Sequence, residues 1–467
     1  MYNGYANKLE DIVKSKMLFT GLIALVIIIA STTPRADEVA VTVYNSNLGV
    51  ISETRTLTFE KGIHNLAYRD VPSQIDPASV RFTVDGGKSV AILEQNFAYD
   101  LVSPDKVFEK YIDSDVDLVG EDDAIFSGKL LAFGGGYLTL QEDDGKIRMV
   151  SSGKVSDVTF PSLPEGLITR PTLFWLYNST QQGSLKTTVG YQTSGLNWSA
   201  EYVGTLNADE NKIDLAGWSS IDNNSGKTYK DATLKLIAGD IHRADQPMIR
   251  GGRAEKFSMT AEAADSYGFE EKAFFEYHMY TLPRKATVAD RETKQISLFD
   301  PASTAVTKIF SYRPDRNQTD VNVAVKFANR ADAGLGMPLP AGRVRIFKAD
   351  TDGSLILLGE DRIKHTPRDE EMKLTVGTAF DVKAELRMMD QRNISKYVNE
   401  YDYEIEIRNR KTEAITVNVE KNLYGNWTIK SSTLPYKKKD ISTVTFDVHA
   451  KAGETVVLKM TVSINSR

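Results

Sequence analysis

Alternation of apolar and polar residues is the feature that most constrains the fold of this chain. Close to its end, single residues that are mostly polar separate Val456, Leu458, Met460, Val462 and Ile464. Successive side chains of a strand point to opposite faces, so this period predicts a strand with one face on a core and one in solvent. Residues 167–467 contain no stretch with the spacing of a long amphipathic helix. The pattern therefore predicts antiparallel sheets that pack as a β-sandwich.

Residues 196–243 show the same alternation on both sides of a turn signal. Trp198, Ala200 and Tyr202 alternate with more polar residues, and a cluster of Asn, Ser and Gly follows at 223–226. Asn, Ser and Gly favour turns because they bond to nearby backbone groups or tolerate left-handed conformations. We predict consecutive antiparallel strands joined by a turn, and we interpret the polar residues here as turn chemistry.

Proline and glycine divide the chain into an expected domain order. The segment 161–171 is rich in proline and predicts a boundary between an N-terminal β-rich region at 37–165 and a C-terminal β-sandwich domain at 166–467. Within the first region, about 104–160 reads as five short strands with glycines at the bends, which predicts a small curled barrel. About 246–269 lacks strand periodicity and is predicted to be a mobile insertion. The expected fold class is all-β.

Residues 1–36 have the pattern of a signal peptide. Lys14 and Lys16 precede an apolar run at 18–30 that gives way to small residues from Ser31. The run is shorter than the ~20 residues that a transmembrane helix needs. We expect a bacterial periplasmic or secreted protein. The alternative is an N-terminal segment retained as an anchor, and no other integral membrane domain is expected.

Composition excludes several classes of function. The 467 residues include no cysteine, which excludes disulfides, thiolate metal sites and cysteine nucleophiles and suits an oxidising compartment. The formal net charge of -6 provides no basic field for nucleic acid. Neither the phosphate loop GxxxxGK[ST] nor the nucleophile elbow GxSxG occurs. We expect no cofactor and no nucleic-acid partner.

One segment, 359–371, concentrates residues that carry chemistry. Its candidate metal ligands are Glu360, Asp361, His365 and Asp369, because carboxylates and imidazoles bind divalent cations or act as general bases. The zinc spacing HExxH is absent. We interpret the segment as a turn whose acids cap backbone amides, and we assign no catalytic, cofactor-binding or metal residue. A metal-assisted hydrolase that uses residues 360–371 is the alternative.

The four tryptophans suggest a further alternative function, that of a carbohydrate-binding module. Trp175, Trp198, Trp218 and Trp427 would stack on sugar rings if they lined one exposed face. Trp198 and Trp218 have apolar neighbours in alternating segments, so we interpret both as core residues.

Four segments together carry a family resemblance. They are 44–82, which begins YNSNLGVISETRTLTF; 196–243; 274–288, FFEYHMYTLPRKATV; and 338–382, which begins PLPAGRVRIF. Their combination resembles exported bacterial proteins whose C-terminal region is a domain of unknown function, a family that includes mucoidy-inhibitor A-like proteins. The resemblance supplies no catalytic residue. The helical coiled-coil segments of mucoidy-inhibitor A-like members have no counterpart in this sequence.

These observations lead to one expectation about function. The strands of a sandwich offer edges to which a partner strand can pair, and no catalytic pattern was found. We expect an exported, non-enzymatic β-sandwich protein of the envelope or periplasm, with an unknown envelope protein or polysaccharide as its partner.

Overall fold

The computed structural model describes residues 36–87, 89–99, 103–121, 124–160, 167–239, 241, 269–314 and 318–466. In these residues, thirty strands form five sheets, accompanied by one short α-helix. The predicted all-β class is confirmed. No helix in this part of the chain is both long and apolar enough to cross a membrane. The predicted signal peptide at 1–36 and insertion at about 246–269 lie outside the described residues, except for Ala36 and Phe269.

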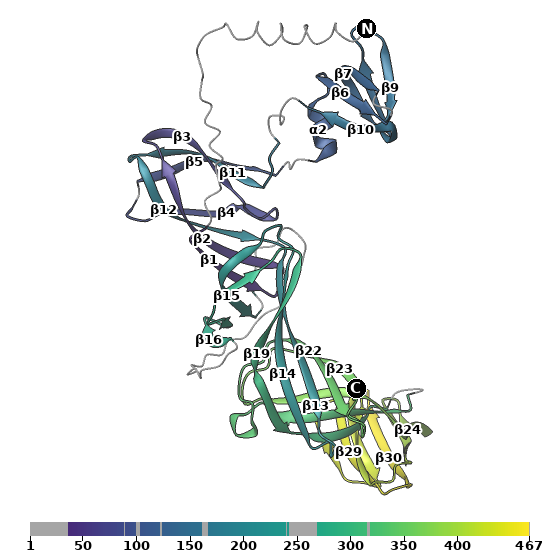
Figure 1. Cartoon of the computed structure of the whole chain (residues 1–467). Coiled ribbons are helices and arrows are strands. Elements are labelled where there is room, and N and C mark those ends of the chain that lie inside the picture. The colour runs from purple at the N-terminus through teal and green to yellow at the C-terminus, as the bar shows by residue number, and fades with distance from the viewer. Residues whose placement is uncertain are drawn as a thin grey trace, which may run out of the picture. The chain divides into compact units, whose positions relative to one another are not determined.

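The β1 sheet has eight strands and joins the beginning of the chain to its middle (Figure 1). Strand β1 pairs with β2 in antiparallel fashion and with β15 in parallel fashion, with Val41 opposite Leu234. A boundary at 165/166 therefore runs between strands of a single sheet. In spatial order the strands are β16 (Glu270–Phe274), β17 (Tyr277–Thr281), β15 (Tyr229–Ala238), β1 (Glu38–Tyr44), β2 (Leu48–Phe59), β12 (Gly183–Thr193) and β4 (Ile75–Val84), and β18 (Ala286–Val288) pairs with β15.

The β11 sheet has three strands and packs against the β1 sheet. Its strands are β3 (Gly62–Arg69), β11 (Thr172–Ser179) and β5 (Val90–Ala98). Aromatic rings fill the layer between the sheets: Phe59 of β2 meets Tyr177 edge-on at 5.1 Å, and Phe82 of β4 meets Trp175 at 5.3 Å. Edge-to-face contacts of this kind add to the stabilisation from burial.

The β7 sheet occupies the region where a small barrel was predicted, and the barrel prediction is wrong. Its five strands form an open sheet with β10 and β9 at the edges. The helix α2 (Pro104–Lys110) follows the N-cap Ser103. Its Phe108 packs on Phe133 of the sheet, so the helix covers one face of the open sheet. The strands are β10 (Val155–Thr159), β6 (Asp115–Gly120), β7 (Ile125–Gly134), β8 (Tyr137–Gln141) and β9 (Ile147–Ser151).

The β13 sheet contains the strands that the segment 196–243 predicted. Strands β13 and β14 pair along their whole length, from Leu196 opposite Asn223 to Leu206 opposite Ile213. Strand β13 also pairs with β22 in parallel fashion, and the five strands run side by side in Figure 1. They are β19 (Glu292–Ala305), β14 (Lys212–Asn223), β13 (Leu196–Leu206), β22 (Gly342–Ala349) and β23 (Leu355–Ile363).

The β24 sheet has nine strands and contributes to two cores. Phe327 of β21 and Leu374 of β24 share a core with Tyr202 of the β13 sheet, whereas the later strands enclose a separate core around Ile407 and Phe446. In spatial order the strands are β27 (Asn426–Ser432), β30 (Thr455–Asn465), β25 (Val398–Asn409), β24 (Glu371–Ser395), β21 (Asp320–Ala328), β20 (Thr307–Tyr312), β26 (Ile415–Asn422), β29 (Thr443–Ala450) and β28 (Tyr436–Lys438).

Two glycines allow a test of the close approach between β23 and β24. A Cβ atom at Gly359 would lie 1.9 Å from the carbonyl oxygen of Val376, whereas one at Gly377 would meet no atom within 4 Å. Gly359→Ala must push the strands apart, so we expect its unfolding free energy to fall by about 1–3 kcal/mol. The control Gly377→Ala should stay within about 0.5 kcal/mol of the wild type. Thermal unfolding checks both, and equal melting temperatures would contradict the packing.

Candidate functional site

Two charged residues of β2 point into the protein interior. The alternation of β2 places Glu53 and Arg55 on the same face as the core residues Ile51, Leu57 and Phe59. Glu53 is 0% exposed and Arg55 is 3% exposed. A buried charge lowers stability unless it is paired and hydrogen-bonded. The surroundings of Glu53 and Arg55 therefore decide whether β2 can pack in this position.

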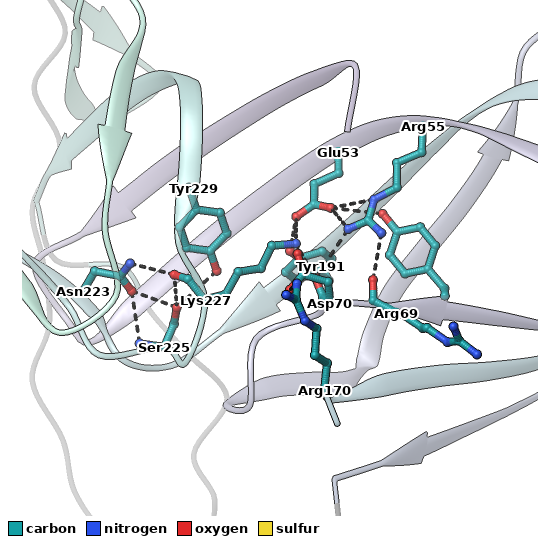
Figure 2. Close-up of polar contacts among 11 residues, drawn as sticks. Glu53, Arg55, Arg69, Asp70, Arg170, Tyr191, Asn223, Ser225, Lys227 and Tyr229 are labelled. Atoms are coloured by element: carbon teal, nitrogen blue, oxygen red, sulfur yellow. Dashed lines mark hydrogen bonds and ion pairs between the residues drawn. The ribbon is translucent and has the colours of Figure 1, made fainter. Parts of the chain in front are cut away.

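The carboxylate of Glu53 lies between two cations (Figure 2). Its Oε2 accepts hydrogen bonds from Nη2 and Nε of Arg55 at 2.5 and 3.2 Å, and its Oε1 accepts one from Nζ of Lys227 at 2.5 Å. The hydroxyl of Tyr191 donates to Oε1 at 2.6 Å, and that of Tyr68 donates to Oε2 at 3.2 Å. Each carboxylate oxygen thus has one cation and one hydroxyl as partners, which satisfies its lone pairs.

Both cations also bind the backbone at the end of β3. Nζ of Lys227 donates to the carbonyl oxygen of Asp70 at 2.5 Å, and Nη1 of Arg55 donates to that of Arg69 at 2.8 Å. The side chain of Asp70 accepts a hydrogen bond from Arg170 at 3.0 Å. The connection that follows β3 is therefore held from inside by two cations and from outside by a third.

A polar turn positions Lys227. The turn predicted at 223–226 lies between β14 and β15, and Asn223 holds it closed. Oδ1 of Asn223 accepts hydrogen bonds from the backbone N–H and the hydroxyl of Ser225 at 3.1 and 2.8 Å, and Nδ2 donates to the carbonyl of Lys227 at 2.8 Å. The Ser225 hydroxyl also lies 3.3 Å from that of Tyr229. All four residues are buried, so this turn brings a lysine into the core.

The charges of this network shift the pKa values of its members. Burial raises the pKa of Glu53, but the charges of Lys227 and Arg55 and the hydrogen bonds from Lys227 and Tyr191 outweigh burial and lower the pKa to about 2. Burial and repulsion from Arg55 lower the pKa of Lys227. Burial and the charge of Glu53 raise the pKa of Tyr191 and of Tyr68 well above the usual value. Both hydroxyls therefore stay protonated and donate to the carboxylate.

We call Glu53, Arg55, Lys227 and the two tyrosines that bind Glu53 the buried clamp. Glu53 and Lys227 are 174 positions apart in the sequence. The clamp joins β2, the end of β3 and the turn before β15. Its donors and acceptors bond one another inside the protein, an arrangement that fixes strand positions rather than one that presents groups to a substrate.

The comparison with protein families identifies the region to which Lys227 belongs. A family model described as Domain of unknown function (DUF4139) matches residues 187–466. The chain belongs to the DUF4139 family. A comparison with curated proteins found no match. Tyr191 and Lys227 lie inside the matched DUF4139 region, whereas Glu53 and Arg55 precede it. Strand β2 thus supplies the carboxylate of the clamp from outside that region.

The four candidate metal ligands of the DUF4139 region do not converge on one point, and three of them have separate partners. Glu360 forms an ion pair with an arginine of β22 at 3.0 Å, and Asp361 accepts a hydrogen bond from a backbone N–H of β24 at 2.6 Å. Nδ1 of His365 accepts a hydrogen bond from a backbone N–H at 3.1 Å, and Asp369 lies in a turn with a φ of 65°. In the part of the chain that the structure describes, no three His, Cys, Asp or Glu side chains gather in a way that could hold a metal ion.

His365 lies at a small hollow next to β17. His278 and Tyr280 of β17 line the hollow together with His365. The rest of the wall consists of three prolines, Ala238, Leu339 and Thr366. Nδ1 of His278 lies 2.7 Å from a carboxylate oxygen of Glu271. The hollow thus combines two imidazoles with a mainly apolar wall.

Three of the four tryptophans are core residues. Trp175, Trp198 and Trp427 are buried, and each indole N–H donates a hydrogen bond at 2.8 or 2.9 Å. Trp218 is 41% exposed on β14, which corrects the prediction that it is a core residue. Since only one of the four is exposed, the DUF4139 protein does not present the adjacent tryptophans that the carbohydrate-binding alternative requires.

The sequence contains a signal for part of the clamp that our predictions did not use. Glu53 and Arg55 have the same parity as Ile51, Leu57 and Phe59, so a period of two already places both charges on the core face. No comparable signal exists for Lys227, because it follows a turn and precedes β15.

Removal of the carboxylate tests the clamp. Glu53→Gln leaves two buried cations without an anion, so we expect the unfolding free energy to fall by about 3–5 kcal/mol. Chemical denaturation monitored by circular dichroism measures this loss. The control Glu371→Gln breaks the exposed ion pair with Lys326 and should cost at most about 1 kcal/mol. Equal losses in the two variants would refute the clamp.

The depressed pKa of Glu53 predicts a pH dependence. The folded pKa of about 2 lies below the ordinary value of 4.5, so the ionised carboxylate stabilises the fold fully above the ordinary pKa and loses this effect as pH falls towards the folded pKa. The difference in unfolding free energy between the wild type and Glu53→Gln should be constant above about pH 5 and shrink by on the order of 3 kcal/mol towards pH 2. A constant difference across this range would show that Glu53 is not ionised in the folded protein.

Proposed function

We propose that this DUF4139 protein is an exported, non-enzymatic β protein of the bacterial envelope or periplasm that binds an envelope protein or polysaccharide, and that it is related to mucoidy-inhibitor A-like proteins. Its titratable core residues serve to hold strands together. Its exposed surface includes a sheet edge suited to binding a partner. Binding, rather than catalysis, accounts for both features.

The observation that carries this proposal is the apolar edge strand β23. Residues 355–358 are Leu, Ile, Leu and Leu, and all four side chains are exposed at the edge of the β13 sheet. Edge strands usually avoid association because they are short or charged. The edge strand β28 of the β24 sheet has this protection, since it spans three residues and two of them are lysines. Strand β23 spans nine residues and has no charged residue among these four, and its ladder with β22 shifts register at Leu358.

Export is supported by the sequence at the beginning of the chain. The basic flank, the apolar run at 18–30 and the small residues from Ser31 have the order of a signal peptide. The absence of cysteine fits a protein that works in an oxidising compartment. Residues 1–35 lie outside the described part of the structure, so this step depends on the sequence alone.

A reporter fusion tests export. Residues 1–40 fused to alkaline phosphatase, which is active only after export, should give active enzyme in the periplasmic fraction of a bacterial host. The control Leu25→Asp/Ile28→Asp places two charges in the apolar run and should abolish that activity, because charges prevent insertion of the apolar segment.

Two results would contradict the proposal. Reporter activity that does not depend on the apolar run would show that this segment is not an export signal. Fractionation of the full chain with cytoplasmic markers would place the protein in the wrong compartment for an envelope partner.

A further inference from the structure

We propose that the free edge of β23 at residues 355–358 binds an extended strand of a partner protein, whose apolar centre is flanked by lysine or arginine. This inference rests on the proposed binding function and names its site and the chemistry of the partner.

The position of β23 leaves one of its edges open over these four residues. Strand β23 is the last strand of the β13 sheet and pairs with β22 alone in the sheet order of the described chain. Strand β24 reaches β23 at the far end, from Gly359, which lies against the carbonyl group of Val376, to Asp361, which accepts a hydrogen bond from the backbone N–H of Thr375 at 2.6 Å. In an antiparallel ladder, alternate backbone groups point away from the paired neighbour. Residues 355–358 therefore present donors and acceptors to an added strand.

The side chains of this edge are apolar on both faces of the sheet. Leu355, Ile356, Leu357 and Leu358 are 59%, 50%, 49% and 37% exposed. Leu355, Ile356 and Leu357 pair in regular register with β22, and the register shifts at Leu358. Successive residues in the regular part point to opposite faces, so a partner strand would find apolar neighbours above and below the sheet. Pairing would cover apolar surface and satisfy backbone groups together, which is how strand addition gives affinity.

Acidic residues lie at both ends of the apolar stretch. Asp350 and Asp352 belong to the turn before β23, and Glu360 and Asp361 follow residues 355–358. Strand β22 already pairs with the other edge of β23 and shows which kind of strand fits it. Strand β22 has the sequence GRVRIFKA, and its Arg345 forms an ion pair with Glu360 at 3.0 Å. Arg343 also lies 4.0 Å from Glu360, so β22 already neutralises this carboxylate. At the open edge, a second strand with apolar residues between basic ones would place its basic residues near Asp350 and Asp352 at one end and near Asp361 at the other.

The same charges argue against a second copy of this chain as the occupant. Two β23 strands paired in antiparallel fashion, with Leu355 opposite Leu358, would place Asp352 opposite Asp361. Like charges directly opposite each other destabilise a strand pair. A basic strand from another protein avoids this repulsion.

Selection from random decapeptides displayed on phage tests the proposal with the full chain as bait. The test variant Ile356→Lys/Leu357→Lys adds charge to the edge. The control Ile147→Lys/Met149→Lys alters another exposed apolar edge strand, β9, where the two side chains are 57% and 64% exposed. Circular dichroism and thermal unfolding establish that both variants fold.

We expect the wild type and the control to select the same peptides, with an apolar centre and lysine or arginine at both ends. In fluorescence anisotropy, these peptides should bind the β23 variant at least about tenfold more weakly. Three results would overturn the inference: no selected peptides, peptides with acidic ends, or equal binding to the β23 variant. Dimerisation of the wild type that the β23 variant abolishes would identify a second copy as the occupant and would also overturn it.

The peptide-binding experiment and the export test can fail independently of each other. Peptide binding by a protein that is not exported would retain the β23 site and reject the envelope function. Export without peptide binding would retain the envelope function and reject β23 as the binding site.

Discussion

The buried carboxylate of Glu53 is the interaction on which the arrangement of the strands around it depends. Desolvation of one carboxylate and two cations costs several kcal/mol per ion, and only close mutual placement offsets that cost. Lys227 reaches Glu53 when the turn at 223–226 is formed and β2 lies beside β12. The favourable ion pairs therefore exist in one arrangement of these segments, and a displaced strand would leave a charge unpaired in the core. The clamp thus fixes the relative positions of β2, the end of β3 and the turn before β15, in addition to any stability that it adds.

This dependence connects the DUF4139 region to the residues before it. The match begins at residue 187, inside β12. Strand β12 pairs with β2 over its whole length, and β15, which follows Lys227, pairs with β1. Without β1 and β2, Lys227 would lose its carboxylate and two strands would lose a neighbour. The structural unit around the clamp is therefore larger than the region that the family model matches.

The sequence predicts the strands at 196–206 and 456–464 correctly because apolar alternation is a local property. The period of two places Glu53 and Arg55 on the core face, but it does not predict the clamp, because their partners Tyr191 and Lys227 approach from distant segments. The barrel prediction failed for a related reason. Glycines at the bends are compatible with both an open and a closed sheet, and the helix after Ser103 decides between them by covering one face of the β7 sheet with Phe108. Long-range contacts, rather than local propensity, determine the features that the sequence left open.

The clamp and strand β23 are opposite departures from the usual distribution of residues. In β2, charges lie where apolar side chains are expected, and the contacts of Glu53 explain their position completely: cations, hydroxyls and backbone carbonyls compensate one another. In β23, four consecutive apolar side chains lie where charges are expected, and the described fold provides no comparable compensation at their open edge. A long exposed apolar edge promotes aggregation, so a sequence that keeps one gains from a partner that covers it. This contrast is the physical reason to look for function at β23 rather than at the charged residues of the core.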